Sequence, residues 1–116
     1  MSARPVLDLD HFRHMTGDDR ALQAEIVALF RGQAQIWRRI IIPDAPVQSW
    51  RDAVHTLKGS ARGLGLWQLA DACEAAEAAT RACNPDSRVI GRELAQVQAA
   101  LCEALDALPA MEAAND

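Results

Sequence analysis

Hydrophobic residues recur along most of the chain at spacings of three and four, which is the period of one face of an α-helix. This pattern predicts five helices, over residues 8–15, 18–42, 46–62, 65–82 and 87–108. Glycine, proline and small polar residues interrupt the pattern at residues 16–18, 43–46 and 84–86, where they favour turns and helix caps. The sequence therefore predicts helices joined by short connections.

Each of the four long helices carries an apolar stripe that predicts its inward face. The stripes are Leu22, Ile26, Leu29, Ile36 and Ile40 (widened by Phe30 and Trp37), then Val47, Trp50, Val54, Leu57, Ala61 and Leu64, then Leu66, Leu69, Ala70, Cys73 and Ala76, and finally Ile90, Leu94, Val97, Leu101, Leu105 and Leu108. We expect an all-α fold, an antiparallel up-and-down four-helix bundle, as a single domain over residues 1–116. The short first helix, with Leu9, Phe12 and Met15 on one face, is expected to pack across one end.

Composition and charge exclude several classes of protein. Half of the 116 residues are apolar, a quarter are charged and the net charge is −4, which does not favour nucleic-acid binding. No apolar run approaches the ~20 residues that span a membrane, and the N-terminal segment is too short and polar for a signal peptide. Cys73, Cys83 and Cys102 show no paired spacing, which favours reduced cysteines. We expect a cytoplasmic monomer that binds neither membranes nor nucleic acid.

The segment from His55 to Gly65 carries the candidate chemistry. His55 lies roughly 130° around the helix from the centre of the apolar stripe, so it should be exposed. The polar and small residues that share its side of the helix are Gln48, Arg51, Lys58, Gly59 and Arg62. This phase predicts an exposed imidazole that is bordered by cations.

Three of the six glycines fall within this segment. A glycine inside a helix costs about 1 kcal/mol relative to alanine. Gly63 and Gly65 are expected to end the helix. Gly59 is different, because Ala61 continues the stripe beyond it. We predict that Gly59 leaves room for a partner protein to approach His55.

An exposed imidazole is largely neutral at pH 7, so one ring nitrogen can attack a phosphoryl group and hold it as a phosphoramidate. Lys58 and Arg62 could neutralise the added charge. The sequence has no P-loop, no Gly-rich loop after a strand and no metal-binding carboxylate cluster. It therefore predicts a phosphocarrier without ATP-dependent kinase activity and without a cofactor or metal of its own. A partner would supply Mg²⁺.

These residues also resemble the signature of histidine-containing phosphotransfer (HPt) domains: His55-Thr-Leu-Lys58-Gly59-Ser60-Ala61, followed by Gly65. The resemblance implies phosphorylation of His55 on Nε2 and exchange with an aspartate of a response-regulator receiver domain. A sensor or hybrid histidine kinase would feed the same phosphorelay. By the same resemblance, Lys58 contacts the phosphoryl group and Gly59 permits close approach. The sequence departs from the common family pattern at Gly63.

Two other interpretations remain open. The chain could be the phosphoacceptor domain of a larger hybrid or chemotaxis-type histidine kinase, or a helical docking module that is not phosphorylated. Candidate partner contacts are Gln48, Arg51, Leu66 and Trp67, with Val47 and Leu64 as further apolar candidates. Trp67 could equally be buried against the first helix.

Two further groups are expected to have no chemical role. Glu77 falls near the inward edge of its helix and is expected to be structural. His11 and His14 lie three residues apart, but no third metal ligand accompanies them, so a solvated face is expected.

Overall fold

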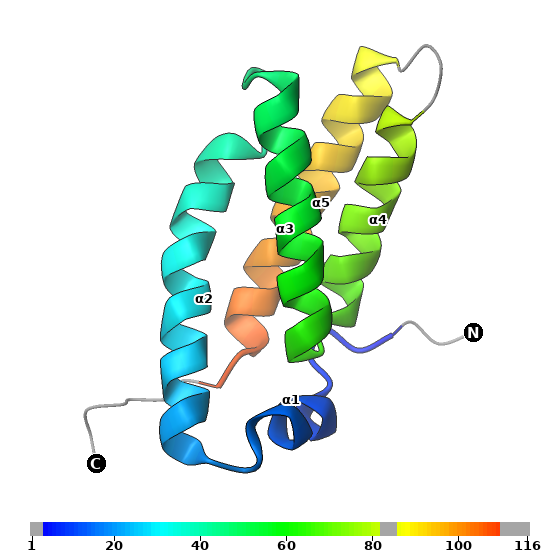
Figure 1. Cartoon of the computed structure of the whole chain (residues 1–116). Helices are drawn as coiled ribbons and strands as arrows, with labels where there is room; N and C mark the ends of the chain where they lie inside the picture. The colour runs from blue at the N-terminus through cyan, green and yellow to red at the C-terminus, as the bar shows by residue number, and fades with distance from the viewer. Residues whose placement is uncertain (1–3, 82–85, 110–116) are drawn as a thin grey trace.

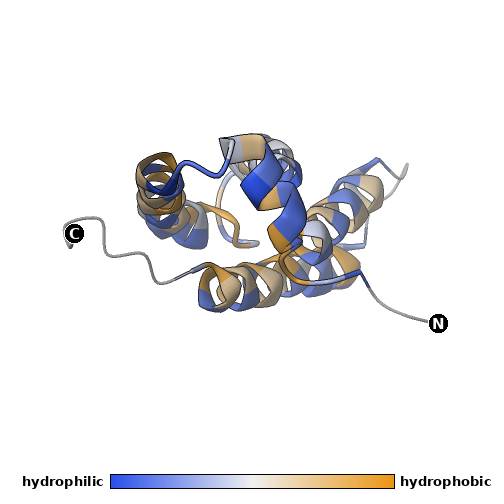
Figure 2. Cartoon of the chain, turned by 90° about the horizontal axis from the view of Figure 1, so that it is seen from below, coloured by the Kyte–Doolittle hydropathy of each residue, from blue (hydrophilic) through white to orange (hydrophobic). Residues whose placement is uncertain are grey.

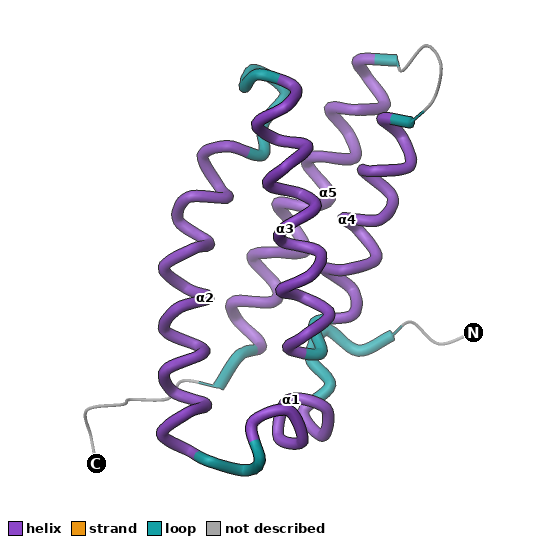
Figure 3. The backbone as a smooth tube through the Cα atoms, viewed as in Figure 1, coloured by secondary structure: helices purple, strands orange, loops and turns teal. Residues whose placement is uncertain are grey.

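The structure is a computed structural model that describes residues 4–81 and 86–109. Within these ranges the chain forms five helices and no strand, which confirms the predicted all-α class (Figures 1 and 3). The helices are α1 (Leu9–Thr16), α2 (Arg20–Ile40), α3 (Val47–Leu64), α4 (Trp67–Thr80) and α5 (Ser87–Ala107). Cys83, the predicted turn residues Asn84 and Pro85, and the tail from Met111 to Asp116 lie outside the described residues.

The long helices lie alongside one another, and each runs opposite to the one before it, while α1 crosses the end where α3 finishes (Figure 1). The most extensive packing joins α4 to both α3 and α5, and α2 touches α3 and α5 less extensively. Each long helix carries both hydrophobic and hydrophilic residues along its length (Figure 2). None of the described helices combines the length and the hydrophobicity needed to cross a membrane.

The core is built from the stripes that the sequence predicted for α3, α4 and α5. Its fully buried residues there include Val54, Leu57, Ala61, Leu66, Leu69, Cys73, Leu94, Val97 and Leu101. Each large aliphatic side chain of this kind contributes about 1.5–3 kcal/mol by leaving water. The helix that carries His55 is therefore anchored through its opposite face.

The predicted centre of the inward face of α2 is wrong, although Phe30 and Trp37, which were predicted to widen that face, are buried. Its buried face consists of Val27, Phe30, Ala34 and Trp37, continued by Ile41, whereas Leu29 is 67% exposed. Leu22 and Ile36 are exposed as well. The helix has two adjacent apolar stripes, and the one that contains both aromatic rings packs against the bundle. In α1, likewise, only Phe12 of the three predicted residues is buried.

Side-chain amide hydrogen bonds attach the end of α2 to α5. Gln98 Nε2 donates to the backbone oxygen of Ile41 at 2.8 Å and to that of Arg38 at 3.1 Å. These carbonyls belong to the last turn of α2 and the residue after it, where no helical N–H follows to satisfy them. Gln98 thus replaces part of the missing backbone pairing.

The end of α3 is fixed by Gly65 and by α1. Gly65 follows the helix in the left-handed conformation, with φ +83°, and its backbone oxygen accepts a hydrogen bond from Asp8 N at 2.8 Å. Gly63, which was predicted to lie beyond the helix, is inside its last turn. The Gly63 carbonyl accepts a hydrogen bond from His11 Nε2 at 3.2 Å. Helix α3 continues past Gly63 because the left-handed residue that ends it is Gly65.

We predict opposite effects for alanine at these two glycines. At Gly65 an added Cβ would lie 3.0 Å from the Asp8 carbonyl oxygen in a left-handed conformation, so Gly65→Ala should destabilise the fold by about 2 kcal/mol. At Gly63 an added Cβ meets nothing within 4 Å, so Gly63→Ala should stabilise it by up to about 1 kcal/mol. Urea unfolding measures both. Equal stabilities for the two variants would contradict this account of the helix end.

Candidate functional site

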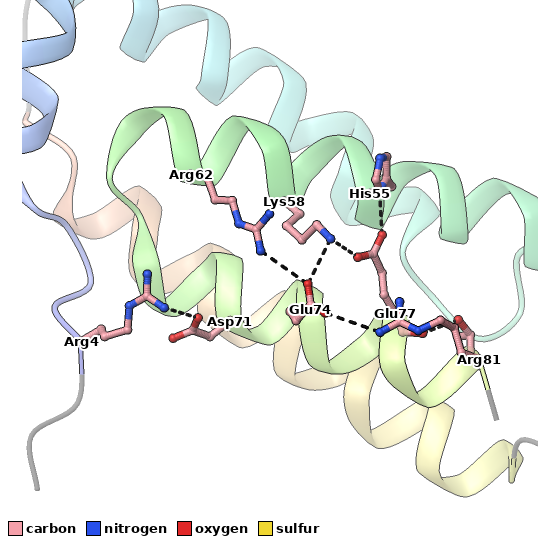
Figure 4. A network of polar contacts seen from close by, with 9 residues as sticks. Arg4, His55, Lys58, Arg62, Asp71, Glu74, Glu77 and Arg81 are labelled. Atoms are coloured by element: carbon pink, nitrogen blue, oxygen red, sulfur yellow. Dashed lines mark hydrogen bonds and ion pairs between the residues drawn. The ribbon is translucent and has the colours of Figure 1, made fainter.

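His55 lies near the middle of α3, and its side chain is 73% exposed. This agrees with the outward phase that the sequence predicted. The neighbouring helix α4 runs beside it and directs Glu74 and Glu77 toward α3, while Arg81, the residue after α4, reaches back to Glu74 (Figure 4). The site is therefore shared by two helices that the core locks together.

The imidazole is oriented by Glu77. Its Nδ1 lies 2.7 Å from Glu77 Oε2. An ionised carboxylate can only accept a hydrogen bond, so Nδ1 must carry the proton. In a neutral ring the lone pair then resides on Nε2, which leaves this nitrogen as the nucleophile.

Glu77 is mostly buried, since only 16% of its side chain is exposed. Burial acts to raise the pKa of this carboxyl, but hydrogen bonds from Lys58 and His55 and the charge of Lys58 outweigh burial, and the pKa lies below its usual range. Glu77 is consequently ionised at neutral pH and can hold the tautomer of His55. The expectation that Glu77 is only structural is therefore incomplete, because this side chain touches His55 directly.

Lys58 is the second partner of Glu77. Its ammonium group donates to Glu77 Oε1 and, at 3.1 Å, to Glu74 Oε1 (Figure 4). The hydrogen bond with Glu77, followed by that with Glu74, raises the pKa of Lys58 above its usual value. An ammonium group has three donors, so one remains for a group bound near the histidine. Lys58 is 13% exposed, less than the sequence phase suggested.

The outer part of the network is centred on Glu74. Arg62 Nη2 lies 3.5 Å from Glu74 Oε1, and Arg81 Nη2 lies 3.5 Å from Glu74 Oε2. The hydrogen bond and the charge of Lys58, with a smaller contribution from Arg81, lower the pKa of the Glu74 carboxyl. Arg62 therefore belongs to the same chain of charges as Lys58, while its partner is Glu74 rather than His55.

A cleft of about 240 Å³ opens beside the histidine. Its polar lining comprises Gln48, Arg51, Asp52, His55, Glu77, Thr80 and Arg81. Gln48 donates to Asp52 at 2.8 Å, and both Gln48 and Arg51 are exposed. The two polar residues predicted to contact a partner are thus next to His55.

Gly59 is exposed one turn beyond His55, and a Cβ added there would meet nothing within 4 Å. The absence of a side chain is therefore not required by packing within the chain. Its predicted role in access stays a prediction, and the open space around it is what that role requires.

Two predicted partner contacts change their role. Leu66 is fully buried, so its assignment to a partner surface is wrong: it lies in the tight turn between α3 and α4 and packs inward. Trp67 is half-buried, donates from Nε1 to Asp8 Oδ2 at 3.1 Å, and packs against the His11 ring in a tilted arrangement with ring centroids 5.0 Å apart. The structure favours burial of Trp67 against α1.

The remaining reactive side chains do not form a second site. Among the described residues no three histidine, cysteine or acidic side chains gather as metal ligands. His11, expected to be solvated, instead packs against Trp67. Burial raises the pKa of the Cys73 thiol to about 12, which leaves it protonated and unreactive.

One of three comparisons with known proteins identified a family for this chain. The family described as Hpt domain matches residues 14–111, most of the 116-residue chain. Neither the curated proteins nor the solved structures gave a match.

We predict that Glu77 sets the tautomer of His55. In the wild type at a pH where His55 is neutral, ¹⁵N NMR should show the Nδ1–H form. Glu77→Ala should shift the ring toward Nε2–H, the form generally preferred by free histidine. Glu74→Ala is the matched control, because it removes a partner of Lys58 that does not touch His55. The same tautomer in all three proteins would contradict the role of Glu77.

Proposed function

The chain belongs to the Hpt domain family, and from this premise we propose that it accepts a phosphoryl group on Nε2 of His55 and exchanges it with aspartates of receiver domains. Hpt domains are phosphocarriers rather than kinases, and they act with receiver domains and histidine kinases in two-component phosphorelays. The observation that carries the proposal is the contact between Nδ1 of His55 and Glu77. It leaves an exposed nitrogen lone pair as the acceptor.

In the proposed reaction the Nε2 lone pair attacks the phosphorus of an aspartyl phosphate. The P–N bond forms as the P–O bond breaks, and the aspartate leaves as a carboxylate with the bonding electron pair. The proton on Nδ1 stays with the ring and remains hydrogen-bonded to Glu77. The positive charge that develops on the ring is stabilised by this carboxylate, in the same way that an aspartate stabilises the imidazolium of a Ser-His-Asp triad.

Lys58 is the residue that we assign to the phosphoryl group. Its ammonium group already lies on Glu77, the partner of His55, and retains one free donor. Glu74 and Glu77 hold it in place before the phosphoryl group arrives. Arg62 provides weaker electrostatic support through Glu74.

The receiver is proposed to dock over the exposed side of α3. Gly59 would let its surface come close, and Gln48 and Arg51, beside the cleft, would meet its polar groups. The acidic active site of a receiver would bring the Mg²⁺ that phosphoryl transfer needs.

We place this exchange in the cytoplasm. We interpret α2 to α5 as an antiparallel up-and-down bundle that presents His55 on one rigid face.

The decisive experiment is incubation of the chain with a phosphorylated receiver domain. We predict an acid-labile, base-stable label on the wild type and none on His55→Gln, because Nε2 of His55 is the proposed acceptor. His14→Gln is the control, since His14 is an exposed histidine on α1 outside the site. An unlabelled wild type would favour the docking-module interpretation, and a labelled His55→Gln would contradict the site. A kinase domain in the parent reading frame would instead identify a phosphoacceptor domain.

A graded series at Gly59 tests access. Gly59→Ala and Gly59→Leu should both leave the helix as stable or stabilise it by up to about 1 kcal/mol, because the position is helical and open. Only Gly59→Leu should weaken receiver binding, by about tenfold, through collision with the docked surface. Titration calorimetry and urea unfolding separate the two effects. Unchanged binding by Gly59→Leu would exclude a close approach at this residue.

A further inference from the structure

The exposed side of α2 carries a second apolar stripe, which we call the α2 seam. Its positions step alternately by four and three residues: Leu22, Ile26, Leu29, Gln33, Ile36 and Ile40. Leu22, Leu29 and Ile36 are exposed large hydrophobic residues, and Ile26 and Ile40 are half-buried. An apolar residue every three and four positions is the pattern of a coiled-coil seam, and this one runs for about 27 Å along the helix.

The α2 seam borders an open groove between α2 and α3 of about 290 Å³. On the side of α3 the groove is lined by Ser60, Gly63 and Leu64. Serine and glycine are small, and a Cβ added at Gly63 would meet nothing within 4 Å. A helix laid on the seam could therefore approach both α2 and α3 closely.

The charges beside the seam identify the occupant. Glu25, Gly32 and Arg39 each precede a seam residue and lie along its solvent side, seven residues apart. If a second α2 crosses antiparallel with Gly32 at the two-fold axis, Glu25 of each copy faces Arg39 of the other. Both side chains are exposed, and neither forms an ion pair within the part of the chain that the structure describes.

The alternative parallel arrangement lacks this complementarity. There, Glu25 and Arg39 would face the other flank of the seam, which consists of Phe30 and Trp37. Both of these side chains are buried in the core of their own chain. The single polar seam residue, Gln33, fits a register-fixing role in an otherwise apolar contact.

We propose that the α2 seam is the interface of a homodimer, in which α2 and its two-fold mate pair antiparallel through Glu25–Arg39 contacts. The symmetric contact is self-complementary, as a two-fold interface must be. This departs from the monomer expected from the sequence, where the stripe was assigned to the core. The α2 groove and the His55 cleft share no lining residue, so the proposed dimer contact and the histidine site use different side chains.

Sedimentation equilibrium of the intact chain tests the proposal. We expect a reversible dimer, and Leu29→Glu should raise its dissociation constant by about tenfold or more, because it buries a charge in the seam. Ala28→Glu is the matched control: it adds the same charge to the adjacent exposed position of α2, which lies outside the seam, and should leave the dimer unchanged. Circular dichroism melting checks that both variants fold.

A charge exchange tests the orientation. Glu25→Arg and Arg39→Glu should each weaken the dimer severalfold by placing like charges opposite each other, and the double variant should restore it. A monomer at every concentration up to about 1 mM would overturn the proposal. A dimer insensitive to Leu29→Glu would also overturn it, as would a double variant that stays weak. If Leu29→Glu instead impaired only receiver binding, the occupant would be the receiver. None of the mass measurements depends on phosphorylation, so the phosphotransfer proposal stands or falls separately.

Discussion

One mostly buried carboxylate, that of Glu77, connects the fold to the chemistry. It lies on α4, yet its two oxygens meet two residues of α3, since Oε2 accepts from His55 and Oε1 from Lys58. This bridge requires α3 and α4 to hold a fixed register. The register comes from their buried faces, where Leu57 and Ala61 pack with Leu69 and Cys73 in one core. A shift of one helix along the other by a turn would separate Glu77 from both partners at once.

The exposed half of α3 is less favourable for a helix than its buried half. Gly59 and Gly63 each cost about 1 kcal/mol relative to alanine. Trp50, Val54 and Leu57 are buried on the other face, and a buried aliphatic or aromatic side chain contributes about 1.5–3 kcal/mol each. The packing therefore outweighs the two glycines. The helix can keep open backbone beside His55 because its stability comes from the opposite side.

Sequence reasoning predicted the parts of the structure that depend on phase within one helix. The outward direction of His55 and the buried stripe of α5 follow from a single period, and both agree with the structure. The link to Glu77 could not be derived in this way, because it depends on how two helices are placed side by side. Its one available signal was a carboxylate at the inward edge of α4, next to buried Cys73 and Ala76. Leu66 was assigned both to the inward stripe and to a partner surface, and the turn after Gly65 directs it inward, as the stripe predicted.

The error in α2 has a different origin and a larger consequence. A stripe on this helix satisfies the helical period whether it contains Phe30 and Trp37 or Leu29 and Ile36, so the pattern shows which residues are apolar and not which face is inward. Tertiary packing makes the choice: the rings of Phe30 and Trp37, 5.5 Å apart between centroids, fill the space beside α3 and α5.

The second apolar stripe of α2 is then left exposed. If α2 packed only against its own bundle, this exposed apolar stripe would lower the solubility of the protein without serving any contact. On α2 it has the coiled-coil period, a single central polar residue and flanking charges of opposite sign at equal distances from Gly32. These features together favour a partner with the same helix over an arbitrary apolar surface, and they lie on the side of α3 away from Glu77. The two sides of α3 can therefore serve different contacts, with the charged side left to the histidine.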